Sequence, residues 1–159
     1  KRRKFVQSIG TFSAGLTLLP SCLSPKRSSA MNIGLQLYTV RHEMGRDAVQ
    51  TLSRVAGIGY DVIETAGYSE GKMYNLTAKA FKSLVDDLNL SAVSGHASLV
   101  ELRDNFDQLL TFMLESDQKY VVLPWLNQED RSTIDQYKAI ADLLNLRGEE
   151  AKSAGKKLC

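Results

Sequence analysis

A carboxylate stands at the end of one short apolar run of the chain. Glu64 follows Val62 and Ile63 in a stretch with the composition of a buried strand. Burying an unpaired carboxylate costs several kcal/mol, more than the burial of a neighbouring aliphatic side chain contributes. We therefore expect Glu64 either to open into a polar binding site or to form a structural salt bridge, for instance to Arg41.

An imidazole and two aromatic rings follow other apolar runs. His96 stands between Gly95 and Ala97, whose small side chains leave room for a ligand. It could bind a substrate hydroxyl, ligate a metal or act as an acid or base, or it could be a structural hydrogen bonder. Trp125 offers a flat apolar face on which a sugar ring could stack, unless it packs under a loop. Tyr38 is a weaker candidate, because an aromatic side chain at such a position often only closes the core.

The elements that must position these side chains repeat with a fixed period. Apolar runs at 33–38, 62–65, 91–94 and 120–124 predict strands, and each begins 29 residues after the one before. Amphipathic patterns between them predict helices that begin after Asp47, near 75–77, after Asp104 and at Ser132 or Thr133. The expected inward faces are Val49, Leu52, Val55 and Ala56; Phe81, Leu84, Val85 and Leu88; Phe106, Leu109, Leu110 and Met113; and Ile134, Tyr137, Ile140, Ala141 and Leu144.

Strands and helices that alternate at this spacing predict βαβ units and a parallel sheet. The loops carry no glycine-rich phosphate fingerprint, and the regular period favours a (βα)8 TIM barrel over a doubly wound sheet. Such a barrel needs roughly 250 residues. Residues 31–159 therefore read as its first half, with about four βα units and the opening of a fifth strand. A fifth strand that pairs across the centre of the sheet would instead favour the doubly wound alternative.

Both architectures bind ligands at the carboxyl ends of parallel strands. Tyr38, Glu64, His96 and Trp125 all fall at or just after predicted strand ends. We therefore predict that these four side chains share one rim of the molecule and contact the same ligand.

The first 30 residues have the pattern of an export signal. Four basic residues precede an apolar run of about 15 residues, which is shorter than the roughly 20 needed to span a bilayer. Residues 1–22 are predicted to be a signal peptide, and Arg2-Arg3 resembles a twin-arginine motif. Leu19-Pro20-Ser21-Cys22 resembles a lipobox, so Cys22 is the predicted lipidation site, and 23–30 would be a flexible tether. Cleavage near Ala30 without a lipid is the alternative.

These features predict a periplasmic protein or a membrane-anchored lipoprotein that contacts the membrane only through its anchor or signal. The net charge of +2 leaves no basic face of the kind that binds nucleic acid. The two cysteines lie near opposite ends of the chain and do not form a disulfide framework.

Four motifs together resemble a known family. "GLQLYTVR" at 34–41, "IGYDVIETAGY" at 58–68, "SGHASL" at 94–99 and "YVVLPWL" at 120–126 occur in this order and spacing. They are similar to the sugar phosphate isomerase/epimerase family, whose members share the xylose isomerase-like TIM barrel and are related to endonuclease IV.

The resemblance implies a divalent metal (Mn, Mg or Zn) and proton transfer next to a sugar carbonyl through an enediolate. Most metal ligands and the proton-transfer base would come from strands five to eight, beyond Cys159. Within this chain the resemblance makes Glu64, His96 and Trp125 substrate-contact positions, with His96 near the metal. The expected partner is a small carbohydrate, and export favours a free sugar, polyol or glycoside over a phosphorylated one. A carbohydrate-binding barrel without catalysis, or a sugar lyase or dehydratase of the same fold, is the alternative.

Overall fold

The computed structural model describes residues 32–159. The predicted signal peptide at 1–22, the lipidation site Cys22 and the tether at 23–30 lie outside these residues. Within the described part of the chain, no helix is both long and apolar enough to cross a membrane.

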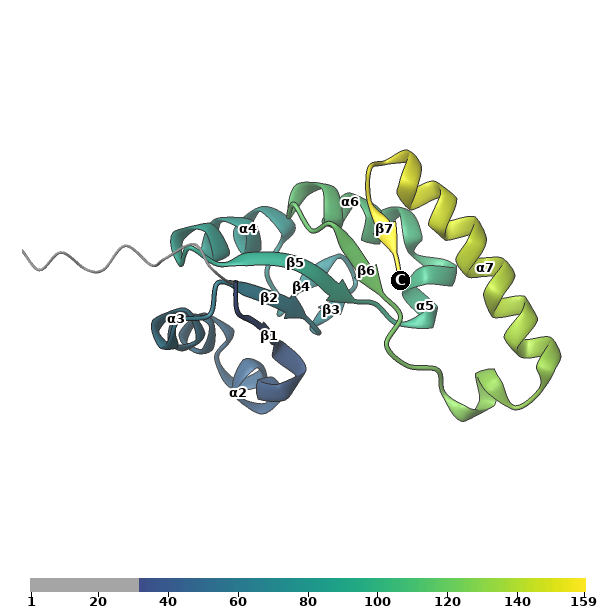
Figure 1. The fold of residues 1–159 in the computed structure, drawn as a ribbon, viewed down its shortest axis with the longest axis horizontal. Coiled ribbons are helices and arrows are strands. Elements are labelled where there is room, and N and C mark those ends of the chain that lie inside the picture. The colour runs from purple at the N-terminus through teal and green to yellow at the C-terminus, as the bar shows by residue number, and fades with distance from the viewer. Residues whose placement is uncertain (1–31) are drawn as a thin grey trace, which may run out of the picture. The chain divides into compact units, whose positions relative to one another are not determined.

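A parallel sheet of five strands forms the centre of the fold (Figure 1). Its strands are β1 (Gly34–Gln36), β2 (Val62–Thr65), β5 (Ser91–His96), β6 (Tyr120–Val122) and β7 (Lys157–Leu158). They pair in the order β1-β2-β5-β6-β7, so each new strand is added beside the previous one. Because β7 pairs with β6 and not across the centre of the sheet, the doubly wound alternative is wrong and the barrel topology is confirmed.

Helices and a short hairpin connect the strands. The helical elements are η1 (Leu37–Val40), α2 (Arg41–Arg46), α3 (Ala48–Ile58), α4 (Ala78–Asp87), α5 (Leu99–Asp104), α6 (Phe106–Glu115), η2 (Gln128–Arg131) and α7 (Ile134–Ser153). Strands β3 (Tyr68–Ser69) and β4 (Lys72–Met73) form an antiparallel hairpin after β2. The side chains of Asp47, Thr77 and Thr133 cap α3, α4 and α7 by accepting backbone N–H bonds.

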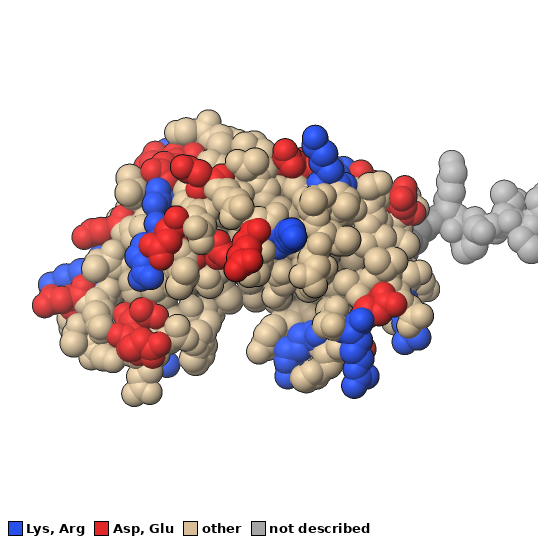
Figure 2. Space-filling view, turned by 180° about the vertical axis from the view of Figure 1, so that it is seen from behind, with Lys and Arg blue, Asp and Glu red and all other residues tan. Residues whose placement is uncertain are grey.

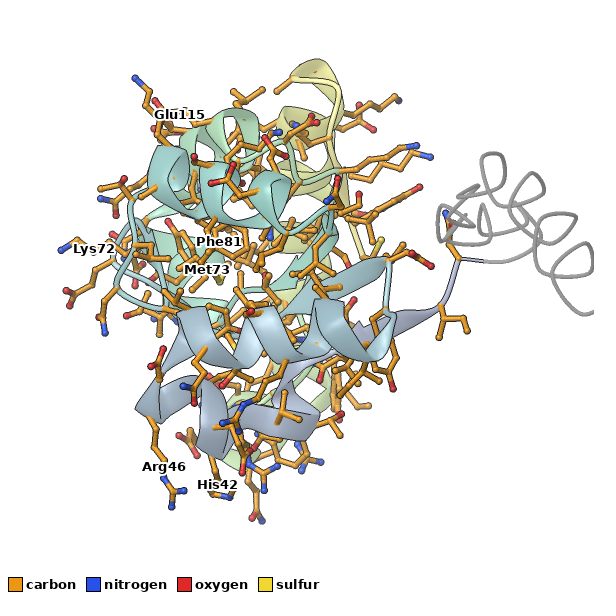
Figure 3. The ribbon with its side chains drawn as sticks, turned by 90° about the vertical axis from the view of Figure 1, so that its left-hand side faces the viewer. His42, Arg46, Lys72, Met73, Phe81 and Glu115 are labelled. Atoms are coloured by element: carbon orange, nitrogen blue, oxygen red, sulfur yellow. The ribbon has the colours of Figure 1, made fainter. Side chains whose placement is uncertain are left out.

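The core lies between the sheet and the helices that follow it. Ile63 of β2, Leu52 of α3 and Phe81 of α4 are completely buried in one cluster. Met73 of the hairpin lies beside Phe81 in this core, whereas Lys72 points away from it (Figure 3). Because side chains alternate along a strand, the residues next to Ile63 face the interior of the barrel. Glu64 is one of them.

The first strand is shorter than predicted. It ends at Gln36, because the chain turns at once into η1 and the Gln36 side chain accepts a bond from the backbone N–H of Tyr38. Tyr38 therefore lies in a 3-10 turn and not at the strand end.

The third helical region also differs from the prediction. Asp104 does not cap a helix; it is the last residue of α5, which begins at the cap Ser98. The Ser98 hydroxyl accepts a hydrogen bond from the N–H of Glu101, and the side chains of Leu99 and Leu102 on α5 are buried. The chain then restarts as α6 after Asn105, which makes no side-chain cap.

Two predicted inward faces are partly wrong. Val49 of α3 is 52% exposed. In α7, Ile134 is 69% and Tyr137 46% exposed, and Ala151 is the one buried residue of this helix. The C-terminal half of α7 packs against β7, and Arg147 donates to the carbonyl of Leu102 on α5. The start of the helix contacts the preceding η2, where Gln136 donates to the carbonyl of Glu129, and leaves Ile134 and Tyr137 exposed.

Candidate functional site

A shift of register in the sheet brings the polar side chains together. Between β2 and β5 the pairing slips by one residue, so that Glu64 pairs with Ser94 and Val93 is left over as a β-bulge. The bulge places Ser94 and His96 on the same face as Glu64. In a regular strand that face would carry Val93 and Gly95 instead, because successive side chains alternate.

The Glu64 carboxylate is hydrogen-bonded at both oxygens. The Ser94 hydroxyl donates to Oε2 at 2.6 Å, and Nε2 of His96 lies 3.0 Å from Oε1. The side chains of Glu64 and His96 are 30% and 21% exposed, so water reaches this pair. The alternative prediction of a salt bridge from Glu64 to Arg41 is wrong. The Arg41 guanidinium lies over the Tyr38 ring at 4.6 Å and donates to the Tyr38 carbonyl.

Gln36 packs on the other side of the imidazole. Its Oε1 accepts from the N–H of Tyr38 at 2.7 Å, which turns the amide NH₂ toward His96. The amide nitrogen lies 3.4 Å from Nδ1 and 3.3 Å from Nε2. At two such similar distances an in-plane position would clash with Cε1 between the nitrogens. The amide therefore lies over the ring face and follows neither lone pair.

His96 opens onto a cleft of about 450 Å³ at the carboxyl ends of the strands. Its walls include Tyr38 of η1, Tyr68 of the hairpin, Ser98 before α5, and Trp125, Asn127 and Asp130 of the β6–α7 loop. Figure 2 shows this side of the molecule hollowed between the lobe of α2 and the lobe of η2 and the start of α7. The size is in the range of pockets for small organic ligands, about 300–1,000 Å³.

Tyr68 contributes a protonated phenol to the wall of the cleft. Burial and the nearby charge of Glu101 raise the pKa of Tyr68 to about 12. Burial likewise raises the pKa of Tyr74, whose hydroxyl accepts the N–H of Ala66, to about 12. Both phenols therefore remain neutral hydrogen-bonding groups throughout the physiological range.

The structure places the four sequence-predicted residues around this cleft. Tyr38, His96 and Trp125 line it, and Glu64 lies directly behind His96. Trp125 is 65% exposed, with the Arg131 guanidinium over its ring at 5.2 Å, so it does not pack under a loop. Their roles in binding stay predictions.

Sequence reasoning missed Gln36 and Ser94. Two signals pointed to them: Ser94 precedes His96 by two residues, and Gln36 is the last polar residue of the first strand. Gln36 pairs with Glu64 in the sheet, but that register cannot be read from the sequence alone. The second histidine, His42, lies on α2 away from this network (Figure 3).

The described residues do not form a divalent-metal site by themselves. Among residues 32–159, no three side chains of His, Cys, Asp or Glu are grouped so that they could hold a metal ion. Zinc sites in proteins use three or four such ligands, and His96 with Glu64 supplies two. The expected metal therefore stays a prediction.

The geometry defines a class of protein: a parallel (βα) barrel of the xylose isomerase-like type, of which the chain supplies about the first four units. No protein-family model matches the chain, and no curated protein matches it.

Solved structures of sugar isomerases and epimerases are similar to it. A sugar phosphate isomerase/epimerase from Parabacteroides distasonis ATCC 8503 matches 82% of this chain with 27% identity and a TM-score of 0.65. A second protein of the same description and organism matches 80% with 21% identity and a TM-score of 0.61. D-psicose 3-epimerase, solved in the presence of D-fructose, matches 81% with 16% identity and a TM-score of 0.55.

The chain spans about half the length of these structures: 52%, 53% and 51% respectively. The last two likenesses, at low identity, show the fold alone. Together the neighbours show a sugar isomerase/epimerase-like fold.

Proposed function

We propose that this chain is the substrate-binding half of a metal-dependent sugar isomerase or epimerase. The substrate is a small carbohydrate, bound in the cleft between Tyr38, His96 and Trp125. The observation that carries the proposal is the Glu64–His96 pair, which lies at the carboxyl ends of the strands and opens onto this cleft. Ligands of parallel barrels bind at this end.

The reaction is a proton shift next to a carbonyl. A base removes the proton from the carbon beside the carbonyl, and the electron pair moves onto the oxygen to give an enediolate. Return of the proton to the other face of the same carbon epimerises the sugar, and return to the neighbouring carbon isomerises it. A bound divalent metal would polarise the carbonyl. The residues described here bind and orient the sugar: Trp125 provides an apolar ring face and His96 a hydrogen-bonding group.

Exchange with solvent tests the proposal. The full-length protein that carries this chain is incubated in D₂O with Mn²⁺, Mg²⁺ or Zn²⁺ and a panel of free aldoses and ketoses, including D-fructose. Proton NMR should show deuterium at the carbon beside the carbonyl, and the exchange should slow sharply with His96→Ala. Solvent exchange that persists undiminished in that variant would contradict the assignment of the cleft.

A carbohydrate-binding protein without catalysis is the second candidate. The exposed Trp125 favours it, because a solvent-facing indole beside a cleft is itself a typical sugar-binding feature. Calorimetric binding of a sugar without deuterium uptake would select this candidate. Formation of an unsaturated or shortened product would instead select a dehydratase or lyase of the same fold.

We further propose that the protein is exported, with Cys22 as the lipid-bearing residue. The basic and apolar segments at the start of the sequence support this. Mass spectrometry of the mature N-terminus distinguishes the outcomes: a diacylated Cys22 supports a lipoprotein, and an unmodified N-terminus near Ala30 supports simple secretion.

A further inference from the structure

The two ring nitrogens of His96 have different surroundings. Nε2 lies 3.0 Å from Oε1 of Glu64. Nδ1 has one neighbour within hydrogen-bond distance among residues 32–159, the Gln36 amide at 3.4 Å, and that amide lies over the ring face. The ring itself lines the cleft. A ligand in the cleft is therefore the natural partner of Nδ1.

The bonds around Glu64 decide which nitrogen carries the proton. An ionised carboxylate only accepts hydrogen bonds. The Ser94 hydroxyl, 2.6 Å away and in a side chain that is 7% exposed, donates to Oε2 and turns Oε1 toward His96. Nε2 must then donate to Oε1. In a neutral imidazole the other nitrogen carries a lone pair, so Nδ1 is an acceptor.

We propose that Ser94 is a positioning residue that acts through Glu64 to hold His96 as the Nε2–H tautomer, so that Nδ1 accepts a hydrogen bond from a carbohydrate hydroxyl. The inference rests on the proposed function of the cleft and names the sugar group recognised there. A carbonyl oxygen has no proton to give and would face the Nδ1 lone pair. The sugar therefore turns a hydroxyl, and not its carbonyl, toward His96.

Two features of the fold preserve this arrangement. The bulge at Val93 puts Ser94 on the face of Glu64, which a regular strand would not do. Gln36 covers one face of the imidazole and is itself fixed by the N–H of Tyr38, which restricts rotation of the ring. A histidine placed by such a second layer of contacts keeps one tautomer in the absence of substrate.

Nitrogen NMR reads the tautomer directly. Spectra of the full-length protein labelled with ¹⁵N-histidine, with His96 assigned by loss of its signals in His96→Asn, should show a protonated Nε2 and an unprotonated Nδ1. Ser94→Ala should give a mixture of tautomers, and Ser94→Thr, which keeps the hydroxyl, should restore the single form. Ser91→Ala, an exposed serine of the same strand, is the matched control and should change nothing. A protonated Nδ1 in the parent protein, or an unchanged tautomer in Ser94→Ala, would overturn the inference.

Kinetics provide a second readout on the same variants. Misplacement of an orienting group by about 1 Å can cost about 10²-fold, and we expect a loss of kcat of up to this size for Ser94→Ala, with recovery in Ser94→Thr. An active protein whose kcat is unaffected by Ser94→Ala refutes the positioning role and leaves the proposed function intact. A single Nε2–H tautomer in a protein without any exchange activity refutes the proposed enzymatic function and leaves the tautomer assignment intact.

Discussion

The two sides of the cleft differ in the hydrogen bonds that hold them. The strand side consists of Gln36, Glu64, Ser94 and His96 on β1, β2 and β5, and the loop side of Trp125, Asn127 and Asp130 between β6 and α7. On the strand side, hydrogen bonds join Glu64 to Ser94 across 30 residues and to His96 across 32, and the Gln36 amide contacts the His96 ring across 60. On the loop side, the bonds are local. Asn127 reaches Asp130 three residues on, and Gln136 reaches the carbonyl of Glu129 seven residues back.

This difference indicates a division of work between the two sides. The strand side acquires its geometry only when β1, β2 and β5 have assembled, and in return it is fixed by a rigid sheet. Chemistry that depends on sub-ångström placement belongs on such elements. The loop side presents an exposed Trp125 on a locally braced segment, which suits recognition of a ring face. Three substitutions and one titration test this division of work.

The largest expected effect is on the strand side. His96→Ala should lower kcat/KM by about 10²-fold for the sugar of the panel that shows exchange, because misplacing a bound substrate by about 1 Å can cost that much. The melting temperature should change little, because the side chain is partly solvated. His42→Ala on α2 is the control and should retain full activity. A melting temperature that falls in step with activity would indicate a structural role for His96.

The second change tests how tightly the strands carry the site. A methyl group added at Gly95 would lie 2.5 Å from Oγ1 of Thr65 and 3.0 Å from Oε1 of Gln118, both of which are buried. Gly95→Ala should therefore lower the free energy of unfolding by about 1–3 kcal/mol, measured by urea denaturation.

Gly57 supplies the matched control for this substitution. It lies in α3, and an added methyl group would meet nothing within 4 Å. Gly57→Ala should leave stability unchanged or raise it by up to about 1 kcal/mol. Equal losses in both variants would show that the strand end is not tightly packed.

The third change addresses the loop side. Trp125→Ala should weaken sugar binding by about 0.5–1.5 kcal/mol, the usual value of a stacked aromatic contact, without moving the melting temperature. Calorimetry with the sugar that shows deuterium exchange measures this change in binding free energy. Tyr137→Ala, an exposed aromatic of α7 outside the cleft, should leave affinity unchanged. Comparable losses in the two variants would remove Trp125 from the site.

The fourth effect is absent at neutral pH and appears only at alkaline pH. The pKa values of Tyr68 and Tyr74 are raised to about 12 in the folded protein, from an ordinary value of 10.0. Between these values the unfolded chain holds fewer protons than the folded one, so stability falls as pH rises. The stability contributed by the two neutral, buried phenols is fully present below pH 10 and is lost as pH passes 12. Ultraviolet titration should show two late-ionising phenols, which Tyr68→Phe reduces to one. Ionisation of all tyrosines near pH 10 would contradict the burial of both rings.

The sequence allows the positions of the strands to be predicted better than their register. The fixed period located β2 at 62–65 and the starts of β5 and β6, because buried parallel strands are apolar runs that stand out between polar loops. The bulge at Val93 depends on how β5 pairs with β2, and no local pattern records that pairing. The pairing of Ser94 with Glu64 could therefore not be predicted, although the need of Glu64 for partners was predictable from the cost of burial.

The helices show a similar limit. Both Ser98 and Asp104 are good helix caps, and the choice between them depends on which apolar residues find a core to pack against. Leu99 and Leu102 do, so the helix begins at Ser98. The apolar stripe of α7 follows the predicted pattern, but burial also requires elements to pack against, and Ile134 remains 69% exposed. Amphipathic pattern predicts which side can be buried, not whether it is.

A double-mutant cycle between Glu64 and His96 tests most directly whether the strand side acts as one unit. The rate of deuterium exchange into the sugar is measured for Glu64→Ala, His96→Ala and the double variant, with Tyr137, which lies outside the cleft, and His96 as the reference pair. We expect the first pair to be coupled by about 0.5–3 kcal/mol and the reference pair to be additive within about 0.5 kcal/mol. Additive losses at Glu64 and His96 would mean that the carboxylate and imidazole act separately, and the account of this cleft would be wrong.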